Sequence, residues 1–234
     1  MVWIVPKEEV NLGTVTILNE TTLKPYTLMG KTAGICYGTP INNEEKNYKR
    51  GKTIAADGHG RVMEYPQVYM ILDGYSARVM REFYTHIGGA PTRLQSSTRY
   101  IQYGDFDYIT PLGLTAEQKV KYDYAMYQIS EAYKDMLAMG IKKEDVANIL
   151  PLGMTTKVVV RTNMRNLIDM SHQRLCSRAY WEFRQLMNDI KNALAAYSDE
   201  WNEITEEYFV PKCEVCGFCI EHQSCGRKPK KENS

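Results

Sequence analysis

The sequence predicts an α/β protein, in the α+β sense, with a central mixed sheet flanked by long helices. Two observations predict this class. Short β-branched or apolar runs bounded by polar turns alternate with longer segments of helical periodicity. The 234 residues also suffice for one large domain with its own core. No internal repeat divides the chain, so we expect a main domain over residues 1–210 and a cysteine-rich basic tail over residues 211–234.

Composition excludes several classes of protein. Hydrophobic residues make up 44% of the chain and charged residues 24%, and 29 basic residues nearly cancel 28 acidic ones. This balance argues against a nucleic-acid or membrane-surface binder, although it permits a local basic pocket. No apolar run approaches the length of a membrane span, and the first ten residues lack the apolar core of a secretion signal. We therefore expect a cytoplasmic protein with neither nucleic acid nor membrane as partner.

Four short segments are predicted to be strands. Residues 14–18 and 68–72 are apolar or β-branched and lie between polar turns. Residues 155–161 (TTKVVVR) give the strongest strand pattern, and residues 97–103 (STRYIQY) give another. The polar, glycine-containing stretch 42–60 is predicted to be a surface loop.

Two helices have clear start signals. The first begins after Ser76, a good N-cap, and ends near His86, where a glycine pair stops it. The second is long and begins with a capping box, since Thr115 is followed three residues later by Gln118. Its apolar residues keep helical spacing to about Gly140.

Further helices are predicted on either side of the strongest strand. A short one is expected over residues 142–149. After the strand, Asn163 can cap a helix that runs to about Arg174. Ser177 can then cap a longer helix that runs to about Tyr197.

A dense polar segment, THIGGAPTRLQSSTRY, occupies residues 85–100. It combines paired glycines, several hydroxyl side chains, and the arginines Arg93 and Arg99. A glycine-rich turn lets backbone N–H groups approach a phosphate, and an arginine can complete the anion site. The alternative is a helix stop followed by a polar loop and an edge strand. Neither a GxxxxGK[ST] nor a GxGxxG motif is present, so the common nucleotide-binding folds are not supported.

The second dense segment, RTNMRNLIDMSHQRLCSRAYWEFR, occupies residues 161–184. It holds five arginines beside two acidic residues, which points to an anion close by. On its first helix Arg165, Asp169 and His172 share one face. The alternative is a solvated charged face of a surface helix.

Together these segments resemble the signatures of flavin-dependent thymidylate synthases (ThyX). HIGGAPTRLQSSTRY resembles the pattern RHRxxSxNxxSxRY, and NMRNLIDMSHQRLCSRAYWEFR resembles the second signature, which closes in RAxWEhR, where h is hydrophobic. GHGRVMEY (58–65) resembles the family segment GHxxxxEH, and ILDGYSARVMREFY (71–84) resembles its SRxxxRQ segment. The similarity covers roughly residues 30 to 185, in the family's order.

The resemblance implies a ThyX-like fold in which residues 1–210 form the catalytic domain. It implies reductive methylation of dUMP to dTMP, with methylenetetrahydrofolate as carbon donor and NADPH as reductant through bound FAD. It also implies a homotetramer with active sites between subunits. An alternative is a related flavin-dependent enzyme that methylates or hydroxymethylates another pyrimidine nucleotide.

The resemblance also implies roles for individual residues. Arg174 matches the family arginine that faces the uracil ring, where a guanidinium can stabilise developing negative charge. FAD contacts are implied at Arg61, Glu64, Thr85, His86, Ile87, Asn163, Arg165, Asp169 and Arg178. Contacts to dUMP are implied at Arg81, Glu82, Gln95, Ser96, Ser97, Thr98, Arg99 and Arg174. In the family, the segment that matches residues 95–99 reaches dUMP from a neighbouring subunit.

The chain departs from the family pattern in two places. Thr85 and Ile87 stand where arginines flank the signature histidine, and Arg93 could supply the missing positive charge. Alanine and asparagine occupy positions 147–148, where the family usually has an arginine. A phosphate contact could then be lost or come from Arg81.

The tail concentrates four of the six cysteines. Clustered thiols in an intracellular protein favour metal ligation over disulfides. The predicted zinc ligands are Cys213, Cys216, Cys219 and Cys225, with His222 among them. Alternatives are thiols that are merely buried or exposed, or a metal-binding or nucleic-acid-binding module built on the basic tail. Cys36 and Cys176 stand alone and are predicted to be small buried hydrophobes.

Overall fold

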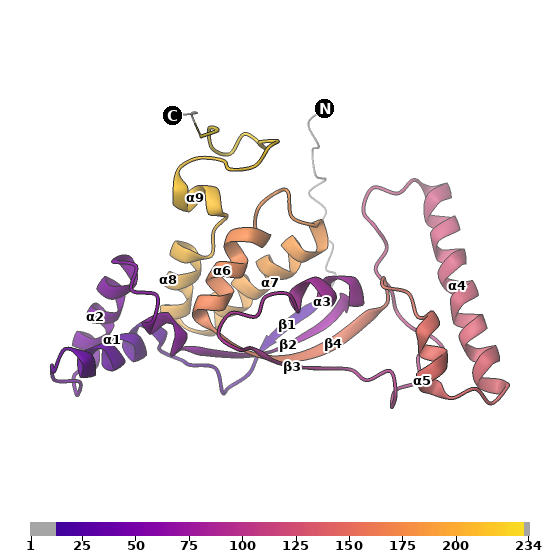
Figure 1. Cartoon of the computed structure of the whole chain (residues 1–234), viewed down its shortest axis with the longest axis horizontal. Helices are drawn as coiled ribbons and strands as arrows, with labels where there is room; N and C mark the ends of the chain where they lie inside the picture. Colours follow the sequence, from indigo (N-terminus) through magenta and orange to yellow (C-terminus); the bar gives the residue numbers. More distant parts are fainter. Residues whose placement is uncertain (1–12, 232–234) are drawn as a thin grey trace.

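A computed structural model describes residues 13–231 of the chain. A small sheet lies at the centre, and the helices α3 (Ala77–Phe83), α6 (Met164–Arg174) and α7 (Trp181–Tyr197) cover one of its faces (Figure 1). The helices α1 (Pro25–Cys36) and α2 (Glu44–Ala56) lie beyond one end of the sheet, and α4 (Ala116–Ala138) and α5 (Lys143–Val146) lie beyond the other (Figure 1). Within residues 13–231, no helix is both long and apolar enough to cross a membrane.

Four strands form the sheet in the order β1-β2-β4-β3, and every neighbouring pair is antiparallel. Their bounds are Thr14–Ile17 (β1), Gln67–Ser76 (β2), Thr92–Gln95 (β3) and Thr155–Asn163 (β4). The predicted mixed sheet is therefore wrong in its strand directions. Parallel neighbours need a crossover connection, usually a helix packed on the sheet face. Here α1–α2 and α4–α5, which connect strands, lie beyond the ends of the sheet instead (Figure 1).

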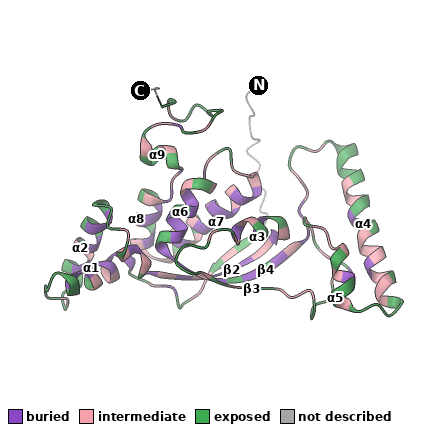
Figure 2. Ribbon diagram, in the orientation of Figure 1, coloured by how far each residue is buried: buried purple, intermediate pink, exposed green. Residues whose placement is uncertain are grey.

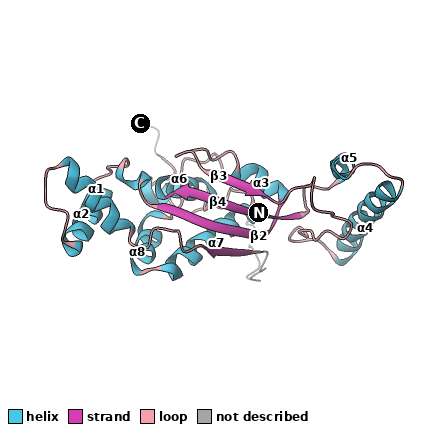
Figure 3. Ribbon diagram, turned by 90° about the horizontal axis from the view of Figure 1, so that it is seen from below, coloured by secondary structure: helices cyan, strands magenta, loops and turns pink. Residues whose placement is uncertain are grey.

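The two central strands alternate between buried and more exposed residues. On β2, Val68, Met70 and Leu72 are fully buried, and Val158 and Val160 are fully buried on β4. These residues pack against α6 and α7 in one continuous core, because alternate side chains of a strand point to the same face. The other face of the sheet carries intermediate and exposed residues and lies in front of the helices when the molecule is seen from below (Figures 2 and 3).

Three predicted helix starts are confirmed by their caps. Ser76 accepts a hydrogen bond from the Val79 N–H at the start of α3 (Ala77–Phe83). Thr115 and Gln118 form the predicted capping box of α4 (Ala116–Ala138). Asn163 accepts from the Asn166 N–H at 2.8 Å, at the start of α6 (Met164–Arg174).

The predicted loop over residues 42–60 is wrong, because most of it is helix α2 (Glu44–Ala56). Its N-cap, Asn43, accepts a hydrogen bond from the Lys46 N–H at 2.8 Å. The helix packs against α1 (Pro25–Cys36), which the sequence did not reveal. A Cβ on Gly30 would lie only 1.8 Å from the Asn47 carbonyl oxygen, so glycine here permits close helix packing.

The predicted strand over residues 97–103 is also wrong. The edge strand β3 lies earlier, at Thr92–Gln95, and the residues after Ser97 form turns. One of these turns is closed by the Ile101 N–H, which donates to the Ser97 carbonyl at 3.0 Å.

Several further helical elements differ from the sequence prediction. The short helix expected over 142–149 is split into α5 (Lys143–Val146) and the 3-10 turn η2 (Ala147–Ile149). Helix α7 (Trp181–Tyr197) starts three residues later than predicted, because its N-cap is Tyr180 and not Ser177. A separate helix, α8 (Asp199–Tyr208), begins after the extended residue Ser198, and a short tail helix, α9 (Lys212–Cys216), follows. The 3-10 turn η1 (Val62–Glu64) precedes β2.

Candidate active site

Arg174, the last residue of α6, lies at the centre of a polar cluster. Its Nε donates to His86 Nε2 at 3.0 Å, and its Nη1 lies 3.2 Å from Glu82 Oε2. The guanidinium also lies over the Phe183 ring, 4.5 Å from the centroid. Three residues predicted for the site therefore meet, from α3, the following loop and α6.

His86 is held as a neutral imidazole. Burial, together with the neighbouring charges of Arg174 and Arg93, lowers the pKa of His86 to about 4. Because Nε2 accepts a hydrogen bond from Arg174, the proton of the neutral ring lies on Nδ1. The ring therefore orients Arg174 without adding a second positive charge.

Arg93 holds the loop that carries His86. Its guanidinium donates to the carbonyl oxygens of Tyr84 and His86 and lies 5.2 Å from the centroids of the Phe83 and Tyr84 rings. Burial lowers the pKa of Arg93, although an arginine stays protonated. Its Nε is buried and has no hydrogen-bond partner within residues 13–231. Arg93 thus brings positive charge near the position of the missing signature arginines, with one donor unused.

The glycine pair after His86 lies against the start of α6. Gly89 has a φ of +68°, and a Cβ there would lie 1.9 Å from Asn163 Nδ2. A Cβ on Gly88 would lie 2.8 Å from Asn166 Oδ1. The loop from His86 to Gly89 therefore connects the Arg174 end of α6 to its N-terminus, and only glycine fits at its closest approach.

A second polar pair lies near the start of α6. Glu64 Oε1 accepts from Arg165 Nη1 at 2.7 Å, and both side chains are about half exposed. Gly60 also lies close, since a Cβ there would lie 3.2 Å from Arg165 Cζ. The segment 58–65 and the second signature are thus neighbours, as the resemblance implies.

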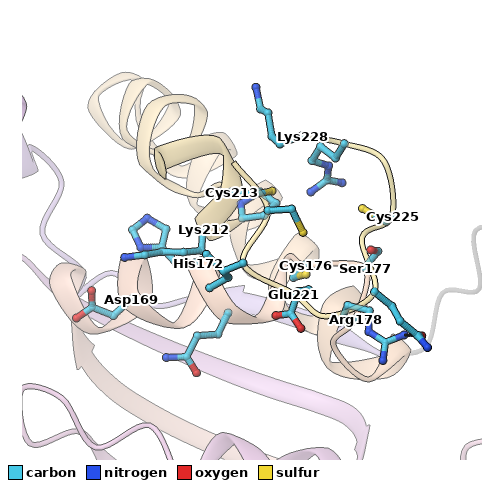
Figure 4. A pocket seen from close by; sticks show the side chains of 16 residues that line it. Asp169, His172, Cys176, Ser177, Arg178, Lys212, Cys213, Glu221, Cys225 and Lys228 are labelled. Atoms are coloured by element: carbon cyan, nitrogen blue, oxygen red, sulfur yellow. Dashed lines mark hydrogen bonds between the residues drawn. The ribbon is translucent and has the colours of Figure 1, made fainter. Parts of the chain in front are cut away.

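The other residues implied for FAD divide into two groups. Arg61, Thr85 and Ile87 are exposed around the same loops, with Ile87 at 74%. Asp169 and Arg178 instead line a cavity beneath the tail, and Arg178 Nη1 donates to Gln223 Oε1 at 3.3 Å (Figure 4). The tail therefore lies over part of the face that was predicted to hold the cofactor.

The segment predicted to bind dUMP lies at the edge of the sheet. Gln95 Nε2 donates to Thr156 Oγ1 at 3.2 Å, and Arg99 Nε lies 2.9 Å from Glu144 Oε2 on α5. Ser96, Ser97 and Thr98 are half-buried between them. Within residues 13–231, no hydrogen bond or ion pair joins this segment to the cluster around Arg174. Arg81 is exposed on α3, next to Glu82.

The four tail cysteines predicted as zinc ligands do not stand together at metal-ligand geometry among residues 13–231. Within the described residues, no group of three or more His, Cys, Asp or Glu side chains is placed to hold a metal ion. Cys213, Cys219 and Cys225 line the cavity beneath the tail, whereas Cys216 does not. Cys176, predicted to be an isolated buried residue, is half-buried and lines the same cavity.

Two residues of the second signature have structural roles that the sequence reasoning missed. Phe183 lies under Arg174, with its ring 5.7 Å from that of His86 in an edge-on arrangement. Glu182 is fully buried and accepts from the N–H and the hydroxyl of Ser76, each at 2.7 Å. Burial raises the pKa of Glu182, and the two bonds from Ser76 oppose that shift. The sequence WEF at residues 181–183, near the end of the signature, could have indicated both structural roles.

Comparison with solved structures identifies the fold. A solved structure of thymidylate synthase X from Helicobacter pylori with FAD and dUMP has the same fold, with a TM-score of 0.65 at 16% identity. The match covers 84% of this chain and 99% of that one.

Sequence comparison finds relatives across most of the chain. A flavin-dependent thymidylate synthase of Nitratidesulfovibrio vulgaris is 28% identical over 211 residues, 82% of each chain. One of Pyrococcus furiosus is 26% identical over 201 residues, 82% of this chain and 80% of the relative. A family model described as thymidylate synthase complementing protein matches residues 17–197, well over half of the chain. The chain therefore belongs to the thymidylate synthase complementing protein (Thy1) family.

Proposed function

We propose that the protein is a flavin-dependent thymidylate synthase, which methylates dUMP to dTMP. The observation that carries this proposal is the Arg174 cluster, in which an arginine, a neutral histidine and a glutamate meet at the end of α6. The relatives that match most of the chain are named for this activity. The structural neighbour holds FAD and dUMP.

The residues around the loop from His86 to Gly89 fit FAD. The glycine pair exposes backbone close to the N-terminus of α6, where a helix of eleven residues favours an anion such as a pyrophosphate. Arg165 lies there with an exposed guanidinium, and Arg93 keeps an unused buried donor. When bound and reduced, FAD would supply the hydride that completes the methyl group.

Arg174 would activate the nucleotide. A guanidinium beside the pyrimidine can stabilise the negative charge that develops on the ring, without a cysteine nucleophile. Its contacts with His86 and Glu82 fix its orientation, and the Phe183 ring excludes water from one side. Because His86 is neutral, it orients the guanidinium and leaves its charge for the substrate.

The co-substrates and the assembly are the finer part of the proposal. Methylenetetrahydrofolate would donate the carbon, and NADPH would reduce the flavin, as the family resemblance implies. A homotetramer is supported by the separation of the segment 95–99 from Arg174, since a neighbouring subunit could then use that segment. All six cysteines lie within residues 13–231 and are free thiols, which fits a reducing compartment such as the cytoplasm.

A second candidate function has one specific observation in its favour. Thr85 and Ile87 replace two signature arginines, and both are exposed beside His86. A pocket changed in this way could take another pyrimidine nucleotide, or the enzyme could add a hydroxymethyl group in place of a methyl group.

Flavin release and product analysis test the proposal. We expect the purified protein to be yellow and to release FAD when denatured. With methylenetetrahydrofolate and NADPH, dUMP should give dTMP, whereas UMP should give no methylated product. A colourless protein that also fails to take up added FAD would refute the proposal. A hydroxymethylated product, or methylation of UMP, would favour the second candidate.

A further inference from the structure

The tail and the end of α6 enclose a cavity of about 590 Å³ that holds an unusual number of thiols. Its lining includes Cys176, which follows α6, and three tail residues, Cys213, Cys219 and Cys225. Figure 4 shows the side chains of Cys176, Cys213 and Cys225 around the same space. Two segments that are distant in sequence therefore bring four thiols to one cavity.

The tail has a defined path that presents these thiols. Gly217 ends α9 in a left-handed conformation with a φ of +78°, and its N–H donates to the Cys213 carbonyl at 3.0 Å. The Cys219 N–H then donates to the Pro229 carbonyl, and Lys228 Nζ lies 2.8 Å from Glu214 Oε2. These bonds close the tail into a loop, and the three cysteines recur at six-residue spacing on its inner side.

We propose that Cys176, Cys213, Cys219 and Cys225 bind one thiophilic divalent metal ion, Zn²⁺ in the first place. Four thiolates satisfy the tetrahedral preference of zinc, and each thiol releases its proton to solvent when the metal binds. No group within residues 13–231 stands at metal-ligand geometry, so binding would require the four sulfurs to draw together around the ion. The metal then ties the tail to the loop two residues after Arg174.

The charges around the cavity suit such a complex. Zinc with four thiolates carries a net charge of −2. The cavity is lined by the cations Arg178, Lys212, Arg227 and Lys228 and by the acids Asp169 and Glu221. Lys228 is paired with Glu214, and the remaining excess of positive charge offsets part of the charge of the complex.

Cys216 provides a matched control. It lies in the same tail, between two of the ligands, yet it does not line the cavity. The site therefore differs from one made by the tail cysteines alone, in which Cys216 would be a ligand and Cys176 would not. Cys176→Ser and Cys216→Ser separate the two arrangements.

Metal content and cobalt spectroscopy test the proposal on the full chain. We expect about one zinc per chain in the wild-type protein and in Cys216→Ser. Co²⁺ should give an intense thiolate-to-metal charge-transfer band in both. Cys176→Ser should bind Co²⁺ at least about 100-fold more weakly, because it loses a ligand and not merely an outer contact.

Thiol counting keeps the test decisive if Cys176→Ser fails to fold. In the metal-loaded wild-type protein, a thiol reagent should modify only Cys36 and Cys216, and a chelator should expose the other four. Equal loss of metal in Cys176→Ser and Cys216→Ser would overturn the proposal. So would a wild-type protein that binds neither Zn²⁺ nor Co²⁺, or one in which the cavity thiols pair as disulfides.

Discussion

At the scale of single residues, the environment of Arg174 decides what the site can do. A guanidinium between a carboxylate and a neutral imidazole is positioned by both. The ion pair with Glu82 lies 3.2 Å apart with both side chains partly exposed, so its net contribution to folding is small. The ion pair instead orients the guanidinium of Arg174, because a planar group with two parallel donors can face a pyrimidine only from a fixed direction.

Arg174→Lys separates catalysis from binding. Lysine keeps the charge but loses the planar fork, so we expect nearly unchanged dUMP affinity and a fall in turnover of roughly 10²–10³-fold. The measurement is dTMP formation at saturating dUMP, with FAD occupancy determined in the same samples. Arg50→Lys, on α2, is the matched control and should retain its rate. Near-normal turnover in both Arg174→Lys and Arg174→Ala would move the role to Arg165 or Arg178.

His86 predicts a pH dependence of stability. The pKa of His86 is about 4 in the folded state, against 6.5 for an ordinary histidine. The unfolded chain therefore binds the extra proton more readily than the folded chain. The stability that neutral His86 contributes is present above about pH 6.5 and is lost as the pH falls toward 4. His86 is only partly buried, so we expect it to account for about 1–2 kcal/mol of that loss.

Chemical unfolding at pH 7.5 and pH 5 measures this effect. His86→Gln keeps a polar side chain without the titration, so its stability should fall less between the two pH values than that of the wild type. Burial also lowers the pKa of His172, which therefore adds to the loss in both proteins and cancels in the difference. Equal losses in the two proteins would show that His86 is not the group responsible.

At the scale of elements, the loop from His86 to Gly89 is the part that joins the two signatures. It runs along α6 from Arg174 to Asn163, and its contact with the helix start depends on glycine. Gly89→Ala would place a methyl group where Asn163 Nδ2 now lies, in a backbone conformation that alanine rarely adopts. Since the loop cannot keep its position, the cofactor site should change with it.

We expect Gly89→Ala to lose most of its FAD affinity and to destabilise the fold by roughly 1–3 kcal/mol. Fluorescence titration with FAD and thermal unfolding measure the two effects. Gly38→Ala is the control, because Gly38 also has a positive φ, +62°, but a Cβ there would meet nothing within 4 Å. If both variants bind FAD equally well, the contact with α6 does not shape the site.

The elements also show which features a sequence can predict. Helix caps were predicted correctly at Ser76, Thr115 and Asn163, because a cap depends on residues within one turn. The helix α2 was missed, because Gly51 and its polar neighbours suggested a loop. That glycine serves a contact with α1, where a Cβ would lie 1.9 Å from the Tyr26 carbonyl oxygen. Such packing joins separate segments and leaves no local pattern.

The active site shows the same difference between features that a local pattern predicts and contacts between distant segments. The family signatures implied that Glu82, His86 and Arg174 belong to one active site, and the structure brings the three side chains into contact. The signatures could not predict that the tail covers the face carrying Asp169 and Arg178, since the tail lies outside them. Nor could spacing within the tail indicate that Cys176, and not Cys216, shares a cavity with the other thiols.

At the scale of the whole molecule, the segment from Gln95 to Arg99 raises a question of assembly. It follows the edge strand β3 and leads toward α5, where Arg99 pairs with Glu144 (Figure 1). Leu94 and Tyr100, at its two ends, are 74% and 77% exposed. An exposed apolar pair around a predicted phosphate-binding segment fits a contact with another subunit.

Mixing two inactive variants tests whether this segment serves a neighbouring subunit. Arg99→Ala should weaken dUMP binding by roughly 1.5–3 kcal/mol, since it removes a charge-assisted contact to the phosphate. Arg174→Ala should bind dUMP and turn over poorly.

If each active site takes its loop from one subunit and Arg174 from another, coexpression of the two variants forms some sites with both residues intact. In a random mixture about a quarter of the sites would be complete, so activity should rise to about that fraction of the wild-type value. A chain that carries both substitutions is the control and should gain nothing when coexpressed with either variant alone. If the segment served its own chain, every site would lack one residue, and the mixture would stay as inactive as its parts.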